Sequence, residues 1–185
     1  MSEEMAIETL AKHWLTFDGY WVQTRVPFKK HRGHSDFDVV AFMPASSKVV
    51  IVECKAWGSP TDYPNFQTAA RAKRIKEMCR KAHRDWKYFG RSAANKRLKL
   101  QKLYEFRLVL PGRLDDKKKQ VDLEKELSLE LGFKVRLFAV HEVIQEVQKQ
   151  VEKDMELRRV RYPDTSLEML RWVSRSKGRL SWRHD

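Results

Sequence analysis

The sequence predicts an α/β domain in which a mixed β-sheet is flanked by helices. Segments with helical and strand periodicity follow one another in the order α-β-β-β-α-β-α-β-α, with three strands in an early meander and later strands separated by helices. Meanders pair antiparallel and helical crossovers join parallel strands, so the sheet should be mixed. The 185 residues, 42% of them hydrophobic, suffice for one core.

A core-facing helix opens the chain. Its apolar side chains recur three and four residues apart at Ile7, Leu10, Ala11, Trp14 and Leu15, and Asp18-Gly19 should end it. Residues 20–26 alternate with period two, which predicts a strand ending at Pro27, and residues 29–34 should form a basic loop.

The next two strands form the predicted hairpin. Residues 37–42 form one strand, residues 44–47 the turn, and residues 48–57 the other strand. Four successive β-branched residues at 49–52 are typical of a central strand.

The second half alternates helices and strands. We expect a long helix over residues 72–89, a strand at 106–110, a helix at 121–131, a strand at 133–140, and a helix from Val143 to Met155. A short helix at 164–173 and a basic tail at 175–183 should follow. We therefore expect a core over residues 1–140, with C-terminal helices and tail over 141–185 packed on the same domain.

Composition excludes several classes of protein. The longest apolar runs are far below the ~20 residues that span a bilayer, and no secretory signal is visible. Cys54 and Cys79 show no zinc or disulfide spacing. We expect a cytoplasmic protein without a membrane partner or a small-molecule cofactor.

Positive charge is concentrated in one segment. The net charge is +13, and residues 71–102 hold thirteen basic residues but only two acids, Glu77 and Asp85. A solvated helix face is the simpler interpretation, and an anionic membrane or acidic protein is another, but such faces usually carry acids for pairing. We expect phosphate contacts. The candidate residues are Lys29, Lys30, Arg32, Arg71, Lys73, Arg74, Lys76, Arg80, Lys81, Arg84 and Lys87.

Charged residues also end the apolar central strand. Alternation places Glu53 and Lys55 on one face, where burial without partners would cost several kcal/mol each. The preceding strand carries Asp36 and Asp38, which alternation also places on one face, and a hairpin would return Glu53 close to them. Carboxylates with few other ligands suit Mg²⁺, which supports phosphodiester hydrolysis. An ion pair that protects an edge strand is the alternative for Glu53 and Lys55, and turn capping for Asp36.

Asp38 followed by Glu53-Cys54-Lys55 resembles the PD-(D/E)xK nuclease superfamily, which includes restriction endonucleases, archaeal Holliday-junction resolvases and Mrr-like enzymes. The resemblance covers about residues 5–140 and implies a restriction-endonuclease-like αβββαβ core with extra C-terminal helices. Phe37 replaces the motif's proline, and only the match to an Asp before an apolar run favours Asp38 over Asp36.

The resemblance implies roles for particular residues. Asp38 and Glu53 would bind Mg²⁺, or Mn²⁺ as a substitute, the Cys54 carbonyl would add a ligand, and Lys55 would assist the attacking water. Glu8 matches a first-helix Glu that approaches the metal, and Gln67 resembles a Gln beside the site in some branches.

We therefore expect a metal-dependent endonuclease that acts on DNA. The alternative is a catalytically silent nucleic-acid-binding module or a subunit of a restriction or repair complex, and an RNA-processing endonuclease is a third class. A homodimer is plausible for an enzyme that cuts both strands.

Overall fold

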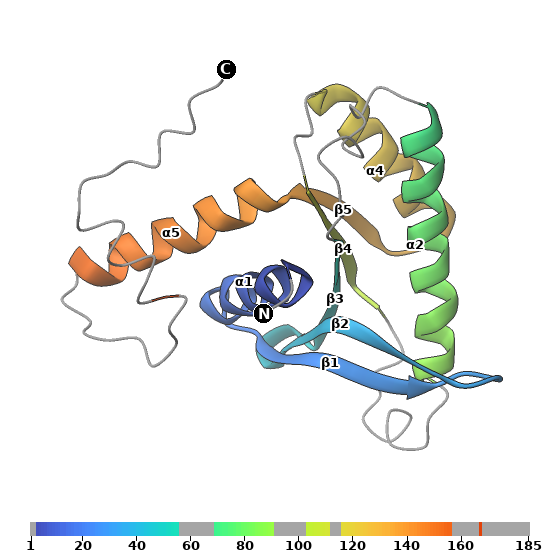
Figure 1. Cartoon of the computed structure of the whole chain (residues 1–185), viewed down its shortest axis with the longest axis horizontal. Helices are drawn as coiled ribbons and strands as arrows, with labels where there is room; N and C mark the ends of the chain where they lie inside the picture. Colours follow the sequence, from blue (N-terminus) through green and yellow to red (C-terminus); the bar gives the residue numbers. More distant parts are fainter. Residues whose placement is uncertain (1–2, 56–68, 91–102, 112–115, 157–166, 168–185) are drawn as a thin grey trace.

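The protein folds into three layers, with helices on both faces of one mixed sheet. The structure is a computed structural model that describes residues 3–55, 69–90, 103–111, 116–156 and 167. Helices α1 (Glu3–Phe17) and α5 (Val140–Glu156) cover one face, and α2 (Ala69–Gly90) and α4 (Lys117–Leu131) cover the other (Figure 1). The predicted α/β class is confirmed, together with the mixed sheet.

The sheet contains five strands in sequence order: β1 (Trp21–Lys29), β2 (His34–Met43), β3 (Lys48–Cys54), β4 (Glu105–Leu110) and β5 (Lys134–Ala139). β1, β2 and β3 pair antiparallel, whereas β3, β4 and β5 pair parallel. β3 is central, as its run of β-branched residues predicts.

Each face of the sheet has its own apolar core. Ile51 of β3 packs with Ile75, Cys79 and Trp86 of α2, whereas Val50 and Val52 pack with α1 and α5. All three β3 side chains are fully buried. β3 therefore has helices over both faces, which explains its lack of apolar-polar alternation before Glu53.

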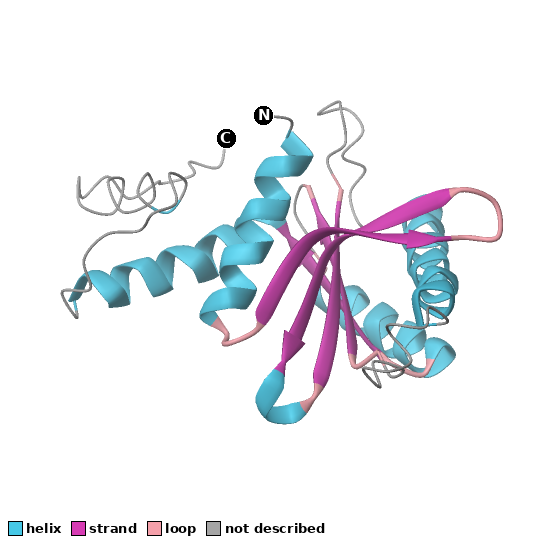
Figure 2. Cartoon of the chain, turned by 90° about the horizontal axis from the view of Figure 1, so that it is seen from below, coloured by secondary structure: helices cyan, strands magenta, loops and turns pink. Residues whose placement is uncertain are grey.

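The first hairpin is longer than the sequence predicts. β1 continues through Pro27 to Lys29 and β2 begins at His34, so the expected basic loop forms the tip of the β1–β2 hairpin, which extends beside α2 (Figure 2). Pro27 is tolerated because β1 is an edge strand, where an N–H group is dispensable. At the tip, the Lys30 N–H donates to Gly33 O, and Gly33 has a φ of +82°.

Halfway along the hairpin, the buried side chains switch from one face of the sheet to the other. Tyr20 packs on the α1 side and Val26 on the α2 side, and β2 shows the same switch between Val39 and Phe37. Arg25, at a φ of +51°, lies between the paired residues of β1 and opposite Asp38. The prediction that alternation places Asp36 and Asp38 on one face is therefore wrong, because alternation does not continue through this point.

Several boundaries differ from the predicted ones. β3 ends at Cys54 rather than at residue 57, and α4 begins at Lys117, where the Asp116 carboxylate caps it by accepting from the Lys119 N–H. The predicted helix at 164–173 lies outside the described residues except for Leu167, and the basic tail lies wholly outside them. None of the helices in the described ranges is long and apolar enough to cross a membrane.

Candidate active site

Two carboxylates and one ammonium converge where the central strand ends. Lys55 Nζ lies 3.0 Å from Glu53 Oε2 and 3.7 Å from Asp38 Oδ2. The side chains of all three residues are less than one-third exposed. The structure thus brings Asp38, Glu53 and Lys55 together.

Backbone contacts explain why these residues meet. The regular β2–β3 pairing ends at Val39 and Val52, and the Asp38 Oδ2 atom then accepts a 2.7 Å hydrogen bond from the Cys54 N–H. Lys55 is anchored by its own N–H, which donates to Val109 O of β4. Asp38 therefore binds the end of the strand that carries Glu53 and positions its own carboxylate beside it.

The pKa values of Glu53 and Lys55 are both raised, for different reasons. Burial, followed by the nearby Asp38 carboxylate, raises the pKa of Glu53 despite the opposing effect of Lys55. Burial alone would lower the pKa of Lys55, but Glu53 and Asp38 outweigh it, so the Lys55 pKa is raised. Lys55 is consequently a charged hydrogen-bond donor at neutral pH and not a general base.

Helix α2 closes one side of this site. Glu53 and Lys55 line a cavity of about 20 Å³ together with Met78, Lys81, Ala82 and Asp85 of α2. Asp85 is buried, accepts from Lys30 Nζ at 3.1 Å, and lies 3.8 Å from Lys81 Nζ. This carboxylate fastens the basic hairpin tip to α2 next to the site.

Glu8, which the resemblance implies to approach the metal, forms an ion pair with Arg25. Its buried carboxylate accepts two hydrogen bonds from Arg25, 2.9 Å from Nη2 and 3.0 Å from Nε. The pKa of the Cys54 thiol is raised well above its ordinary value by burial, and the Asp38, Glu8 and Glu53 carboxylates add to this shift. Arg25 supplies the counter-charge of Glu8.

The other predicted site residues are Asp36, Cys54 and Gln67, and each has a different position. Asp36 is exposed and pairs with Pro27 in the β1–β2 ladder, with no contact to Glu53 or Lys55 among the described residues. Of the two aspartates, Asp38 is the one that lies beside Glu53 and Lys55. Cys54 is buried on the α1 side. Gln67 lies outside the described residues.

The expected phosphate-contact set requires two corrections. Arg71 is only 3% exposed and its Nη2 lies 3.5 Å from Pro111 O, so it cannot serve as a surface contact. The expectation that the basic segment lacks acidic partners also fails, because α4 supplies them: Lys76 pairs with Glu126, and Arg80 pairs through two hydrogen bonds with Glu130. Periodicity within α2 could not reveal partners on another helix.

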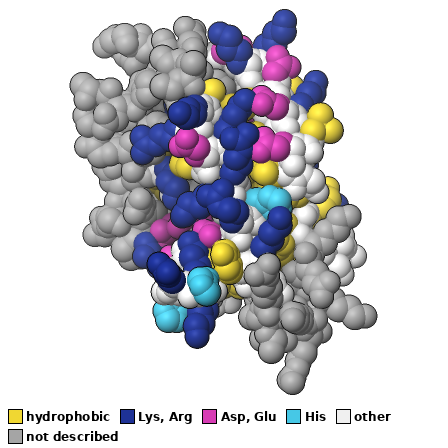
Figure 3. Space-filling model, turned by 90° about the vertical axis from the view of Figure 1, so that its right-hand side faces the viewer, with side chains coloured by type: hydrophobic (Ala, Val, Ile, Leu, Met, Phe, Trp, Pro, Cys, Tyr) yellow, Lys and Arg dark blue, Asp and Glu magenta, His cyan; other side chains and the backbone are white. Residues whose placement is uncertain are grey.

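Other basic residues remain available at the surface. Figure 3 views the side of the molecule on which α2 lies and shows Lys and Arg side chains gathered there, with acids among them. Lys73, Arg84 and Lys87 of α2, and Lys29 and Arg32 of the hairpin tip, are exposed and have no ion-pair partner in the described part of the chain. We call these five residues the unpaired basic set. Arg74 is exposed but has a partner.

The donor chemistry of the site suits a hard divalent cation. The Asp38 and Glu53 carboxylates both lie within 3.7 Å of Lys55 Nζ. Like-charge repulsion between them contributes to the raised Glu53 pKa, and a divalent cation would relieve that repulsion. The described residues contain no group of three or more His, Cys, Asp or Glu side chains that could hold a metal. Mg²⁺ accepts such a sparse set because it retains several waters.

Sequence reasoning missed two residues that shape the site, Arg25 and Asp85. Arg25 carries no sequence signal, because a positive φ at a non-glycine residue is not readable from composition. Asp85 does carry one, since it is one of only two acids in the basic segment and follows Lys81 by four residues.

Comparisons with known proteins add no functional information. No family model matches the chain, and no curated protein matches it. One solved structure, "Crystal Structure of Protein of Unknown Function AF1548", is similar, with a TM-score of 0.40 and 11% sequence identity over 94% of this chain and 96% of that chain. This likeness is too weak to carry an argument.

Proposed function

We propose that the protein is a metal-dependent endonuclease that hydrolyses DNA phosphodiester bonds, with a restriction-endonuclease-like core. The observation that carries the proposal is the convergence of Asp38, Glu53 and Lys55 at the end of the central strand, on a site closed by α2, the helix that with the hairpin tip carries the unpaired basic set. Charges that are partly buried at the end of an apolar strand are costly, which favours a functional role over a structural one.

The chain's residues divide the work of hydrolysis. Asp38 and Glu53 would hold Mg²⁺, or Mn²⁺ in its place, with the Cys54 carbonyl as a further ligand. The ion would supply Lewis-acid stabilisation of the scissile phosphate and activation of water. Lys55, held in its protonated form, would donate to the phosphate oxygen or to the attacking water and stabilise the charge that develops there.

The unpaired basic set would hold the DNA backbone. Removal of unpaired cations should cost more affinity than removal of cations that α4 already neutralises. We expect Arg84→Ala with Lys87→Ala to reduce the salt slope of DNA binding by about two, and Lys76→Ala with Arg80→Ala to reduce it less. Equal effects of these charge-matched pairs, measured by fluorescence anisotropy over a salt series, would contradict this interface.

The test of catalysis is nicking of supercoiled plasmid with Mg²⁺ or Mn²⁺. Asp38→Asn retains an oxygen that can accept from the Cys54 N–H, so it removes the charge while keeping the strand contact. We expect Asp38→Asn, Glu53→Gln and Lys55→Met to abolish metal-dependent nicking while retaining DNA binding. Lys149→Met is the matched control, because Lys149 pairs with Glu146 on α5 away from the site.

Two results would remove the enzyme proposal: no metal-dependent nicking by wild-type protein on duplex, single-stranded or branched DNA, or equal nicking by wild type and all three site variants. Cleavage of RNA alone would change the substrate class.

A catalytically silent DNA-binding module is the second candidate. It is favoured by the position of Lys55, whose ammonium already supplies a counter-charge to both carboxylates without a metal. This candidate predicts salt-dependent DNA binding without cleavage, and no change in stability when Ca²⁺ or Mg²⁺ is added.

A further inference from the structure

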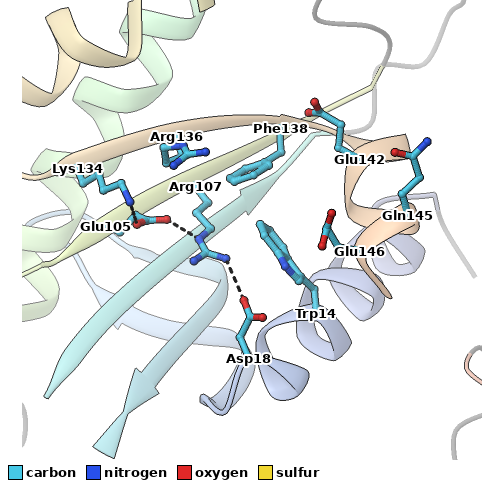
Figure 4. Close-up of a pocket in the computed structure, with 10 residues that line it drawn as sticks. All are labelled: Trp14, Asp18, Glu105, Arg107, Lys134, Arg136, Phe138, Glu142, Gln145 and Glu146. Atoms are coloured by element: carbon cyan, nitrogen blue, oxygen red, sulfur yellow. Dashed lines mark hydrogen bonds and ion pairs between the residues drawn. The ribbon is translucent and has the colours of Figure 1, made fainter. Parts of the chain in front are cut away.

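A second site lies on the opposite face of the sheet, away from α2. A pocket of about 480 Å³ opens between β4, β5, α5 and the end of α1 (Figure 4). This volume lies within the ~300–1,000 Å³ range of small-molecule sites. The pocket shares no lining residue with the proposed active site.

Charged side chains form the floor of the pocket, where a sheet with helices on both faces would normally carry apolar ones. β4 and β5 place apolar side chains toward α2 and α4, but Glu105, Arg107, Lys134 and Arg136 line the pocket on the other face. Glu105 and Arg107 are both more than nine-tenths buried. Such burial is costly in a structural role, which points to a ligand.

Neighbouring side chains orient Arg107 but do not use all of its hydrogen-bond donors. Its Nε donates to Glu105 Oε1 at 2.6 Å, and its guanidinium carbon lies 4.4 Å from the centroid of the Trp14 ring. Its Nη1 atom is buried without a hydrogen bond, and the Asp18 Oδ2 atom lies 3.9 Å from it. Arg107 therefore presents an unused donor in the pocket, where a carboxylate or phosphate could accept from it.

The rim of the pocket has the opposite charge. The side chains of Asp18 and Glu146 are 46% and 52% exposed, and both line the pocket. Each also has a basic neighbour, since Lys149 Nζ lies 2.7 Å from Glu146 and Arg107 Nη1 lies 3.9 Å from Asp18. Burial raises the pKa of Asp18; Arg107 opposes this shift and Glu146 adds to it, so the two carboxylates act on one another across the opening. Two neighbouring carboxylates favour a cationic group between them.

We propose that this pocket binds a small zwitterion of the amino-acid class, with its carboxylate on Arg107 and its ammonium between Asp18 and Glu146. The rim carboxylates disfavour a nucleic-acid strand or a nucleotide, because their phosphates would meet Asp18, Glu142 and Glu146 before reaching the basic floor, even though Lys117 and Lys149 offset part of the charge of Glu142 and Glu146. A ligand with both charges would use the open Arg107 donor and bring a cation to the two rim carboxylates, at Glu146 in competition with Lys149. This site is independent of the proposed nuclease function.

Titration with the standard L-amino acids, one at a time, tests the proposal. Thermal unfolding identifies binders and isothermal calorimetry measures their affinity. We expect at least one amino acid to raise Tm by about 5–10 °C at roughly 100 times its Kd. Propionate and propylamine, which each carry one of the two charges, and AMP should give no comparable shift.

Variants locate the binding. Arg107→Lys keeps the charge beside Glu105 but loses the planar donor fork, and should weaken binding at least about tenfold. Glu146→Gln, an exposed substitution without a folding risk, should weaken it about fivefold. Glu126→Gln, at a similarly exposed carboxylate on α4, should leave the affinity unchanged.

Three results would overturn the proposal: no amino acid binds at millimolar concentration, AMP binds more tightly than any amino acid, or Glu146→Gln binds as tightly as wild type. If Arg107→Lys does not fold, amide chemical-shift changes on wild-type protein decide the location, since they should fall on β4, β5 and α5. Changes confined to other elements would place the ligand elsewhere and refute the site.

Discussion

Removal of the Lys55 ammonium should destabilise the protein in a way that a divalent cation can reverse. At an effective dielectric constant of about 20, a unit charge pair is worth about 5.5 kcal/mol at the 3.0 Å from Nζ to Glu53 and about 4.5 kcal/mol at the 3.7 Å to Asp38. The cost of burying the ammonium offsets much of this attraction. Lys55→Met nevertheless leaves two neighbouring carboxylates without their counter-charge.

The expected net loss is about 3 kcal/mol, at the lower end of the effects of breaking a buried ion pair. It is limited because Glu53, whose pKa burial already raises, can take up a proton when Lys55 is absent. For a chain of this length the loss corresponds to a Tm decrease of roughly 6–12 °C. Lys81→Met is the control, since Lys81 is 60% exposed and lies 3.8 Å from Asp85, and it should cost less than about 1 kcal/mol.

Thermal and urea unfolding with EDTA and with Ca²⁺ provide the assay. Ca²⁺ should stabilise Lys55→Met more than wild type, because in the variant it meets two uncompensated carboxylates. Glu53→Gln combined with Lys55→Met should recover part of the loss, because it removes one of those carboxylates. Refutation would come from a loss below about 1 kcal/mol in Lys55→Met, or from equal stabilisation of wild type and variant by Ca²⁺.

Three further predictions concern groups around the site. Arg25→Ala should lower the free energy of unfolding by about 2 kcal/mol, because the Glu8 carboxylate loses its bidentate partner. Glu8→Gln should restore part of the lost stability in the double variant. Strictly additive losses of the two variants in urea unfolding would count against an interaction between Arg25 and Glu8. Burial and Asp38 raise the pKa of Glu53, so protonation of Glu53 favours the folded state. In EDTA, the contribution of Glu53 to stability should therefore be present at low pH and be lost as pH rises through the folded-state pKa of Glu53. Glu53→Gln should remove that part of the pH dependence, which unfolding over a pH series can show. Burial raises the pKa of Cys79 to about 12 and that of Cys54 well above its ordinary range, so a thiol reagent at mildly alkaline pH should label neither in native protein and both in urea; native labelling would disprove this.

The first hairpin shows the limit of sequence reasoning. Alternation correctly predicts two strands here but not their extension to Lys29 and His34. It also misses the left-handed backbone conformation of Arg25, where the buried side chains of the hairpin switch from one face of the sheet to the other. A residue in that conformation costs roughly 1–3 kcal/mol, which surrounding contacts must offset. The bidentate Arg25–Glu8 pair is such a contact, and it joins residues seventeen positions apart.

The sequence by itself determined the order of helices and strands, the central place of β3, and the approach of Glu53 to Asp38, because periodicity and a short hairpin turn are local properties of the chain. Only the tertiary structure decided that Arg25 pairs with Glu8, that α4 neutralises Lys76 and Arg80, and that Asp85 joins the hairpin tip to α2. The pocket around Arg107 has the same origin. Each of these contacts joins side chains from separate elements, and their meeting depends on how the layers pack rather than on spacing along the chain.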